Sequence, residues 1–150
     1  MREISFRGKQ EDNGEWVYGA YYHQTEFYGD DCDYHYIISS CDELEDNMMC
    51  FDGVIPETVG QFTGLTDKNG KKIFEGDIVR CKYANTPANE HIQKVVFYDG
   101  KFMAEFSQGG CYAELYDGAT HFSFDKSVYM TEIEVIGNIH DNPELLGGDY

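Results

Sequence analysis

The residues of this chain that could do chemistry begin with a group of soft metal ligands. Cys32 and His35 are three positions apart. Cys41 lies nine residues after Cys32, and Cys50 lies nine residues after Cys41. Zinc favours tetrahedral sets of cysteine and histidine, so these four side chains are the first candidate for a metal site. The group lacks the Cys-x-x-Cys knuckle that supplies two ligands from a single turn. The sequence therefore favours ordinary thiols and a strand histidine, and we expect no metal or other cofactor.

A calcium loop and a nucleophilic centre are the next candidates. The segment 67–70 superficially resembles the start of an EF-hand loop, but Gly70 comes too early and Ile78 stands where the ligating glutamate belongs. None of the five histidines lies in a recognised nucleophile motif, and no glycine-rich loop follows a phosphate-binding pattern. The sequence predicts a turn at 67–70 and a protein that is not an enzyme.

Negative charge is the strongest global feature of the sequence. The net charge is −17, and residues 10–67 hold 14 acidic side chains and no lysine or arginine. Such a surface repels nucleic acid over most of its area, because phosphate binding depends on lysine and arginine. Plain solubility is the simplest interpretation. A binding role for the acids is the alternative, with these candidate interaction residues: Asp42, Glu43, Glu45 and Asp46.

Positive charge is concentrated in residues 68–101, which hold seven basic and four acidic side chains. Single-strand binders combine positive grooves with aromatic platforms, and Tyr83 and Tyr98 lie close by in the sequence. The candidate residues are Arg80, Lys82, Lys94 and Lys101. Six charges in a strongly anionic chain make a weak field, so pairing with the surrounding carboxylates is the favoured interpretation. A nucleic-acid partner is not expected.

The elements that must position these residues are short strands. Residues 94–106 form two β-rich runs separated by Asp99-Gly100, which predicts a hairpin with a type I′ turn. A final strand is expected at 132–139, followed by one helical turn at 142–146 with Asn142 as its cap. The acidic segments 30–33 and 42–46 are expected to lie in solvated loops or a short surface helix.

Alternation along the strand expected at 77–83 predicts which side chains are buried. Cys81 falls on the same face as Val79, among the buried residues, whereas Arg80 and Lys82 share the other face with Ile78 and are expected to meet water. Free cysteine behaves as a small buried apolar residue, which fits this placement.

The compartment is expected to be the cytoplasm. The N-terminus lacks the apolar run of a secretory signal, and no stretch approaches the roughly 20 apolar residues that a membrane span needs. Five cysteines are an odd number, which together with the absent signal predicts reduced thiols.

The chain resembles the YopX family of phage and prophage proteins at both ends and in its centre. The segments that carry the resemblance are Arg2–Gly8, Trp16–Gly19, Val59–Leu65, Asp67–Gly70, Ile73–Val79, Val95–Tyr98 and Val135–Leu146. The resemblance implies a β-rich fold with an SH3-type barrel, self-association and an origin in a mobile genetic element. It implies no activity and no site residues. Segment 23–55 matches the family least.

The expected fold is therefore mostly β, with an N-terminal β-rich region carrying acidic loops (1–58) and a small SH3-type barrel (59–150), or one integrated unit of both. Three functions compete: a non-catalytic assembly module that forms a homo-oligomer and docks another protein, an acidic mimic of nucleic acid that inhibits a host DNA-handling or defence enzyme, and a weak nucleic-acid binder. We expect the first.

Overall fold

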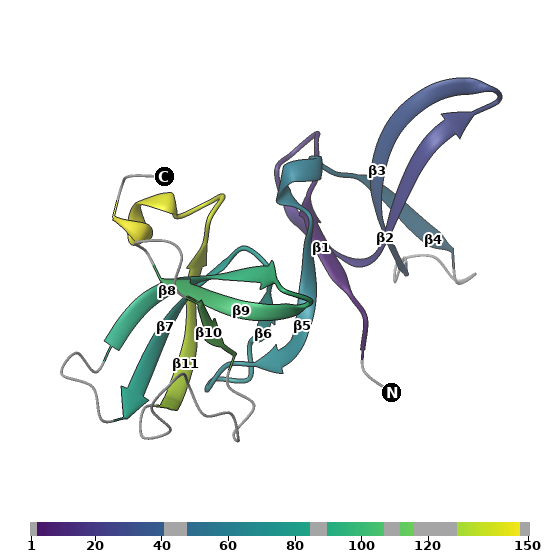
Figure 1. The fold of residues 1–150 in the computed structure, drawn as a ribbon. Coiled ribbons are helices and arrows are strands. Elements are labelled where there is room, and N and C mark those ends of the chain that lie inside the picture. The colour runs from purple at the N-terminus through teal and green to yellow at the C-terminus, as the bar shows by residue number, and fades with distance from the viewer. Residues whose placement is uncertain (1–2, 41–47, 85–89, 107–111, 116–128, 148–150) are drawn as a thin grey trace. The chain divides into compact units, whose positions relative to one another are not determined.

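A computed structural model describes residues 3–40, 48–84, 90–106, 112–115 and 129–147 (Figure 1). The strands are β1 (Phe6–Lys9), β2 (Trp16–Phe27), β3 (Asp30–Ser40), β4 (Met49–Gly53), β5 (Gly60–Thr66), β6 (Lys72–Phe74), β7 (Asp77–Ala84), β8 (Glu90–Tyr98), β9 (Lys101–Phe106), β10 (Tyr112–Glu114) and β11 (Tyr129–Asn138). Two short 3-10 helices, η1 (Pro56–Thr58) and η2 (Pro143–Leu146), complete the described elements. The prediction of a mostly β protein is confirmed. None of the described helices is long and apolar enough to cross a membrane.

The chain divides into two compact units, 1–62 and 63–150. The boundary expected from the sequence at 58/59 precedes β5, whereas the observed division lies within that strand. Each unit is built on antiparallel strands. In the first, the strands pair in the order β4-β3-β2-β1-β5. β5 continues into the second unit and pairs with β6, and the other sheet of the second unit has the order β10-β9-β8-β7-β11.

The first unit is dominated by the long β2–β3 hairpin. Its two-residue turn is Tyr28-Gly29, and both residues have positive φ, as a type I′ hairpin turn requires. The segment 30–33, which we expected in a solvated loop, instead begins β3. Its charged residues are tolerated in a strand because the far end of the hairpin is mostly exposed.

A small core lies on one face of this first sheet. Ile37 and Val54 are fully buried, and two glycines let the backbone approach them closely. A Cβ added at Gly8 would press on Val54, and one added at Gly19 would collide with the carbonyl of Ile38. The first contact brings β1 against the residue that follows β4, and the second brings β2 close to β3.

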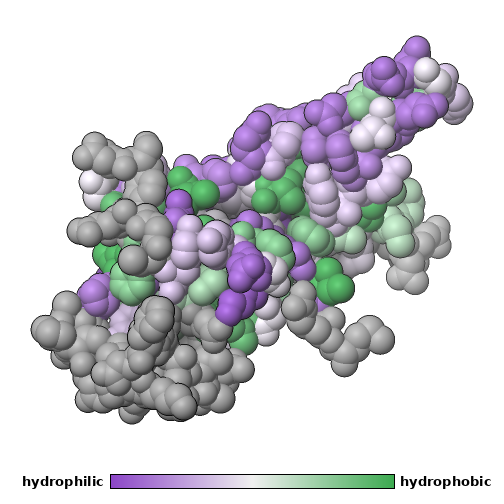
Figure 2. Space-filling view, viewed as in Figure 1, coloured by the Kyte–Doolittle hydropathy of each residue, from purple (hydrophilic) through white to green (hydrophobic). Residues whose placement is uncertain are grey.

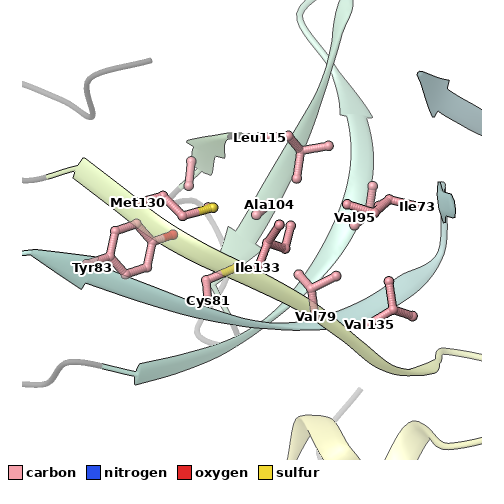
Figure 3. Close-up of a cluster of buried hydrophobic side chains, with 11 residues drawn as sticks. Ile73, Val79, Cys81, Tyr83, Val95, Ala104, Leu115, Met130, Ile133 and Val135 are labelled. Carbon is pink, nitrogen blue, oxygen red and sulfur yellow. The ribbon is translucent and has the colours of Figure 1, made fainter. Parts of the chain in front are cut away.

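The second unit has the larger core, drawn in Figure 3. Its members are Ile73, Val79, Cys81, Tyr83, Val95, Ala104, Ala113, Leu115, Met130, Ile133 and Val135. The hairpin predicted around Asp99-Gly100 is confirmed, with both residues at positive φ. The final strand and the last helical turn are confirmed as β11 and η2.

Alternation along β7 is confirmed with one exception. Cys81 is buried, and Arg80 and Lys82 are partly exposed, as expected. Ile78 was expected to face water and is instead fully buried. It pairs with Gly137 at a register shift in β11, and such a shift breaks the strict alternation on which the prediction relied.

Two further expectations were wrong or unconfirmed. Asn142 precedes η2 but makes no side-chain cap bond; its Oδ1 accepts instead from the Asn138 N–H at 3.4 Å. An SH3-type barrel is not confirmed, because neither sheet closes within the described residues. The edge strands β10 and β11 do not pair, and β10 has only three residues with which to reach a neighbour.

Asp67 is the main polar anchor of the second unit. Its Oδ1 accepts from the backbone N–H of Asn69 and Lys71, and its Oδ2 accepts from that of Val135, all within 3.0 Å. Burial alone would raise the pKa of Asp67, but these backbone donors hold the pKa below its ordinary value. The carboxylate therefore ties the 67–70 turn to β11.

We predict that Asp67→Asn lowers the free energy of unfolding by about 2–3 kcal/mol, because buried hydrogen bonds to a charged acceptor are lost. A carboxyl whose pKa is lower when folded stabilises above its unfolded-state pKa of about 3.9, and that contribution is lost as the pH falls through the folded-state value. Urea unfolding at several pH values checks both points. Unchanged stability at neutral pH would contradict this role.

We predict that Gly19→Ala destabilises the first unit by about 2 kcal/mol or more, because the new methyl group meets backbone rather than a movable side chain. Gly53→Ala is the matched control. Its Cβ would lie 3.6 Å from a carboxylate oxygen of Glu11, which is an ordinary contact, so we expect a change below about 0.5 kcal/mol. Equal effects of the two substitutions in thermal unfolding would argue against the close approach.

Candidate functional site

The β2–β3 hairpin presents two chemically different faces. Alternate residues of a strand point to opposite sides, and cross-strand partners share a side. Tyr22 pairs with Tyr36, whereas the next residue, His23, pairs with His35. Aromatic side chains therefore collect on one face of the hairpin, and imidazoles collect on the other.

We call the first of these the aromatic face. It consists of Tyr18, Tyr22, Tyr34, Tyr36, Met49 and Phe51. Tyr36 lies at its centre, with ring centroids 6.5 Å from Tyr22 and 6.4 Å from Phe51. Phe51 is 59% exposed, and Tyr22 is 46% exposed.

Hydropathy colouring alone does not reveal this face. In Figure 2 the hairpin is mostly purple and pale, because tyrosine and charged residues rank as hydrophilic on that scale. Register and exposure identify it instead: of its six members, only Tyr36 is less than 46% exposed. An apolar surface of this kind, lying outside the core, is typical of an interaction site.

The opposite face carries a cluster of two histidines and an aspartate, which we call the His–Asp cluster. His23 Nε2 lies 2.7 Å from Asp33 Oδ1, and His35 Nε2 lies 3.2 Å from the same oxygen. The two imidazole rings are stacked, with centroids 4.3 Å apart. Ligand atoms of all three side chains lie within 4.8 Å of one another, close enough to share one ion.

Tyr21 completes the cluster from the core side. Its hydroxyl lies 2.6 Å from His35 Nδ1. The hydrogen bond from His23 holds the pKa of Asp33 below its ordinary value. Partial burial, and then the negative charge of Asp33, raise the pKa of Tyr21. Asp33 is thus an ionised carboxylate at neutral pH, and Tyr21 is a neutral hydroxyl.

The metal ligands considered from the sequence are not brought together among the described residues. Cys32 Sγ donates to the Gln24 carbonyl at 3.4 Å, away from His35. Cys50 is in a disulfide whose partner lies outside the described residues, as does Cys41, so the expectation of reduced thiols was wrong for Cys50. His35 instead lies beside His23 and Asp33, and the sequence did not predict that these three residues come together.

The buried cysteine is not a reactive nucleophile. Cys81 is fully buried, and burial raises the pKa of its thiol to about 12. Tyr83 lies two residues along the strand and donates to Gln93 Oε1 at 2.6 Å; its pKa is raised by burial as well. Both groups are protonated at neutral pH and serve the core.

The candidate cations of the second unit form ion pairs with neighbouring strands. Lys82 Nζ lies 2.9 Å from Glu132, Lys94 Nζ lies 2.8 Å from Glu105, and Arg80 lies 3.5 Å from Glu134. Hydrogen bonding to Glu132 raises the pKa of Lys82. Lys101 begins β9, opposite Tyr98. The acidic candidates Asp42, Glu43, Glu45 and Asp46 lie outside the described residues.

The family is decided by a match over nearly the whole chain: the YopX protein family matches residues 5–147. The chain belongs to the YopX family. No curated protein matches this YopX chain. It is similar to the crystal structure of protein EF1440 from Enterococcus faecalis, at 21% sequence identity and a TM-score of 0.49, over 97% of this chain and 99% of that one. A likeness at that level carries no argument about function.

We predict that the YopX chain does not bind DNA at about 100 mM salt, because the net charge is −17 and Arg80, Lys82 and Lys94 are paired with carboxylates. Fluorescence anisotropy with a labelled single-stranded oligonucleotide measures this. The double variant Glu132→Gln, Glu134→Gln removes the carboxylate partners of Lys68 and Arg80 and the nearer of the two partners of Lys82, which keeps Glu90 at 3.7 Å. We expect weak, salt-sensitive binding from this variant alone. Tight, salt-dependent binding by the unmodified chain would instead support the nucleic-acid alternative.

Proposed function

We propose that this YopX-family chain is a non-catalytic assembly module that binds a second copy of itself through the aromatic face. The observation that carries the proposal is the exposure of that face. Five of its six members, Tyr18, Tyr22, Tyr34, Met49 and Phe51, are between 46% and 67% exposed. Burying apolar surface contributes about 25 cal/mol per Å², so a partner that covers these side chains gains a substantial driving force.

The dimensions of the face suit the centre of an interface between folded proteins. From Tyr18 to Gln24, the position opposite Tyr34, β2 spans about 20 Å at roughly 3.3 Å per residue, and three neighbouring strands are about 14 Å wide. The projected area is on the order of 300 Å², which is part of the roughly 800 Å² that each partner contributes to a standard interface.

Tyrosine supports binding through its shape as well as its area. It combines a rigid ring with a hydroxyl that hydrogen-bonds at the edge of an interface, and it is enriched among the residues that dominate binding energy. Tyr22, Tyr36 and Phe51 form a continuous row across three strands. Such a row supplies a central anchor with tyrosine hydroxyls around it.

Charges at the two ends of the face favour a second copy as the occupant. Near one end, Lys9 lies over the Trp16 ring, with Nζ 5.7 Å from the ring centroid. At the other end, Glu26 and Asp31 are cross-strand partners, and like charges directly opposite each other are destabilising. A two-fold arrangement centred near Tyr22 would bring the cation of each copy towards the carboxylates of the other.

The other functions considered from the sequence have less structural support. The acidic-mimic alternative depends on the net charge and on acidic residues outside the described part of the chain. The SH3-type barrel and a phage origin are part of this proposal through the family resemblance. A cytoplasmic location and a second protein partner remain expectations from the sequence. Self-association at the aromatic face is the part that side-chain geometry supports.

We expect sedimentation equilibrium of the full chain to show a reversible dimer at micromolar concentrations. The double variant Tyr22→Ser, Phe51→Ser should weaken dimerisation at least tenfold, because its ring anchors are lost. Phe97→Ser is the matched control: Phe97 is 55% exposed on β8 of the second unit, and its loss should leave the dimer intact. A chain that is monomeric at 100-fold higher concentration, or a dimer sensitive only to the control, would overturn the proposal.

A further inference from the structure

The His–Asp cluster lies on the side of the β2–β3 hairpin away from the aromatic face. His23 and His35 are directly opposite each other in the register, and the contacts of Asp33 with both rings place its carboxylate on the same side of the sheet. The hairpin therefore positions three metal-ligating groups before any ion arrives. Neither the family match nor the proposed self-association requires this arrangement.

We propose that His23, Asp33 and His35 bind a Zn²⁺ ion, with water in the remaining coordination position. Two imidazole nitrogens and one carboxylate oxygen are a ligand set that zinc accepts, and sites with three protein ligands keep an open fourth position. Magnesium and calcium prefer all-oxygen ligands, so the two histidines disfavour both ions.

The distances suit this ion. Ligands about 2.0–2.1 Å from a tetrahedral zinc lie about 3.4 Å from one another. The His35 Nε2 to Asp33 Oδ1 distance is 3.2 Å, and the His23 Nε2 to Asp33 Oδ1 distance is 2.7 Å. Ligand atoms of all three side chains lie within 4.8 Å of one another, so rotation of the exposed His23 and Asp33 side chains is the movement that would bring them to coordination spacing.

Tyr21 supplies the supporting contact that a metal-binding histidine needs. A histidine that binds metal through Nε2 carries its proton on Nδ1, and that proton is normally donated to a neighbouring acceptor. The Tyr21 hydroxyl oxygen lies 2.6 Å from His35 Nδ1 and accepts in this tautomer. Tyr21 is itself held against Phe6, at 5.6 Å between ring centroids, so it is a positioning residue anchored to β1.

The simpler interpretation is that Asp33 accepts hydrogen bonds from two surface histidines and binds no ion. Two features favour the metal. Two imidazoles converge on a single carboxylate oxygen rather than on separate partners. Tyr21 contacts His35 at Nδ1, on the other side of the ring, and so orients it. The rings are stacked 10° from parallel, so their lone pairs point in nearly the same direction, and the exposed His23 ring has to tilt to bind the shared ion.

The test is isothermal titration of the full chain with ZnCl₂, in a buffer that does not chelate zinc. We expect one ion per chain, and at least tenfold weaker binding in His23→Gln and in His35→Gln. Tyr21→Phe keeps the ring and removes the acceptor, so we expect binding to weaken about 10- to 100-fold. Co²⁺ should give visible absorption in the unmodified chain, and His23→Gln should lose this signal.

Two control variants separate this site from other zinc-binding groups. Cys32→Ser removes the partly exposed thiol of the hairpin, and His140→Gln removes a partly exposed histidine of the second unit; both should bind zinc as the unmodified chain does. The variant Tyr22→Ser, Phe51→Ser should also bind normally, which separates this proposal from self-association. Absence of zinc binding, binding that survives loss of His23 and His35 with circular dichroism unchanged, or binding lost in Cys32→Ser would overturn the proposal.

Discussion

The register of the β2–β3 hairpin is the constraint on which both candidate surfaces depend. A slip of one residue would exchange the two faces, placing tyrosines beside the core and histidines among the exposed rings. The turn at Tyr28-Gly29 starts the pairing, and a bulge between Gln24 and Glu26 shifts it by one residue before His23 meets His35. Ile37 is fully buried, and it stabilises this register because its side chain reaches the core from only one of the two faces.

The second unit obtains its order from buried polar contacts added to a larger apolar core. Asp67 binds three backbone N–H groups from two distant segments, and Tyr83 donates to Gln93 inside the core. Hydrogen bonds of this kind stabilise the fold and also strongly disfavour other arrangements, because an unmade partner would be left buried. The ion pairs on the exposed side of β7 are of the weaker, solvent-screened type.

Local patterns in the sequence predicted what local physics determines. Asp99-Gly100 predicts its own turn, and alternation from Val79 to Tyr83 predicts which side of β7 is buried, since both depend on a few adjacent residues. The His–Asp cluster was missed because it depends on strand pairing across a turn whose first residue, Tyr28, is not a typical turn former. It also depends on a bulge between Gln24 and Glu26 that no sequence motif predicts. Ile78 was misplaced for the same reason, since its burial follows from a register shift in β11.

The two units differ in their balance of charge, which bears on why both proposed binding surfaces lie on the first unit. Residues 1–62 hold 14 acidic and 3 basic side chains, whereas residues 63–150 hold 14 and 8. In the second unit the described cations of β7 and β8 meet carboxylates on neighbouring strands, so these cations are neutralised within the fold, although the unit keeps an excess of six acidic side chains. In the first unit Glu26 lies opposite Asp31, and Asp33 contacts two histidines. Cations from outside the chain, whether a metal ion or the lysine of a second copy, would relieve that imbalance, and the second unit has less need of either.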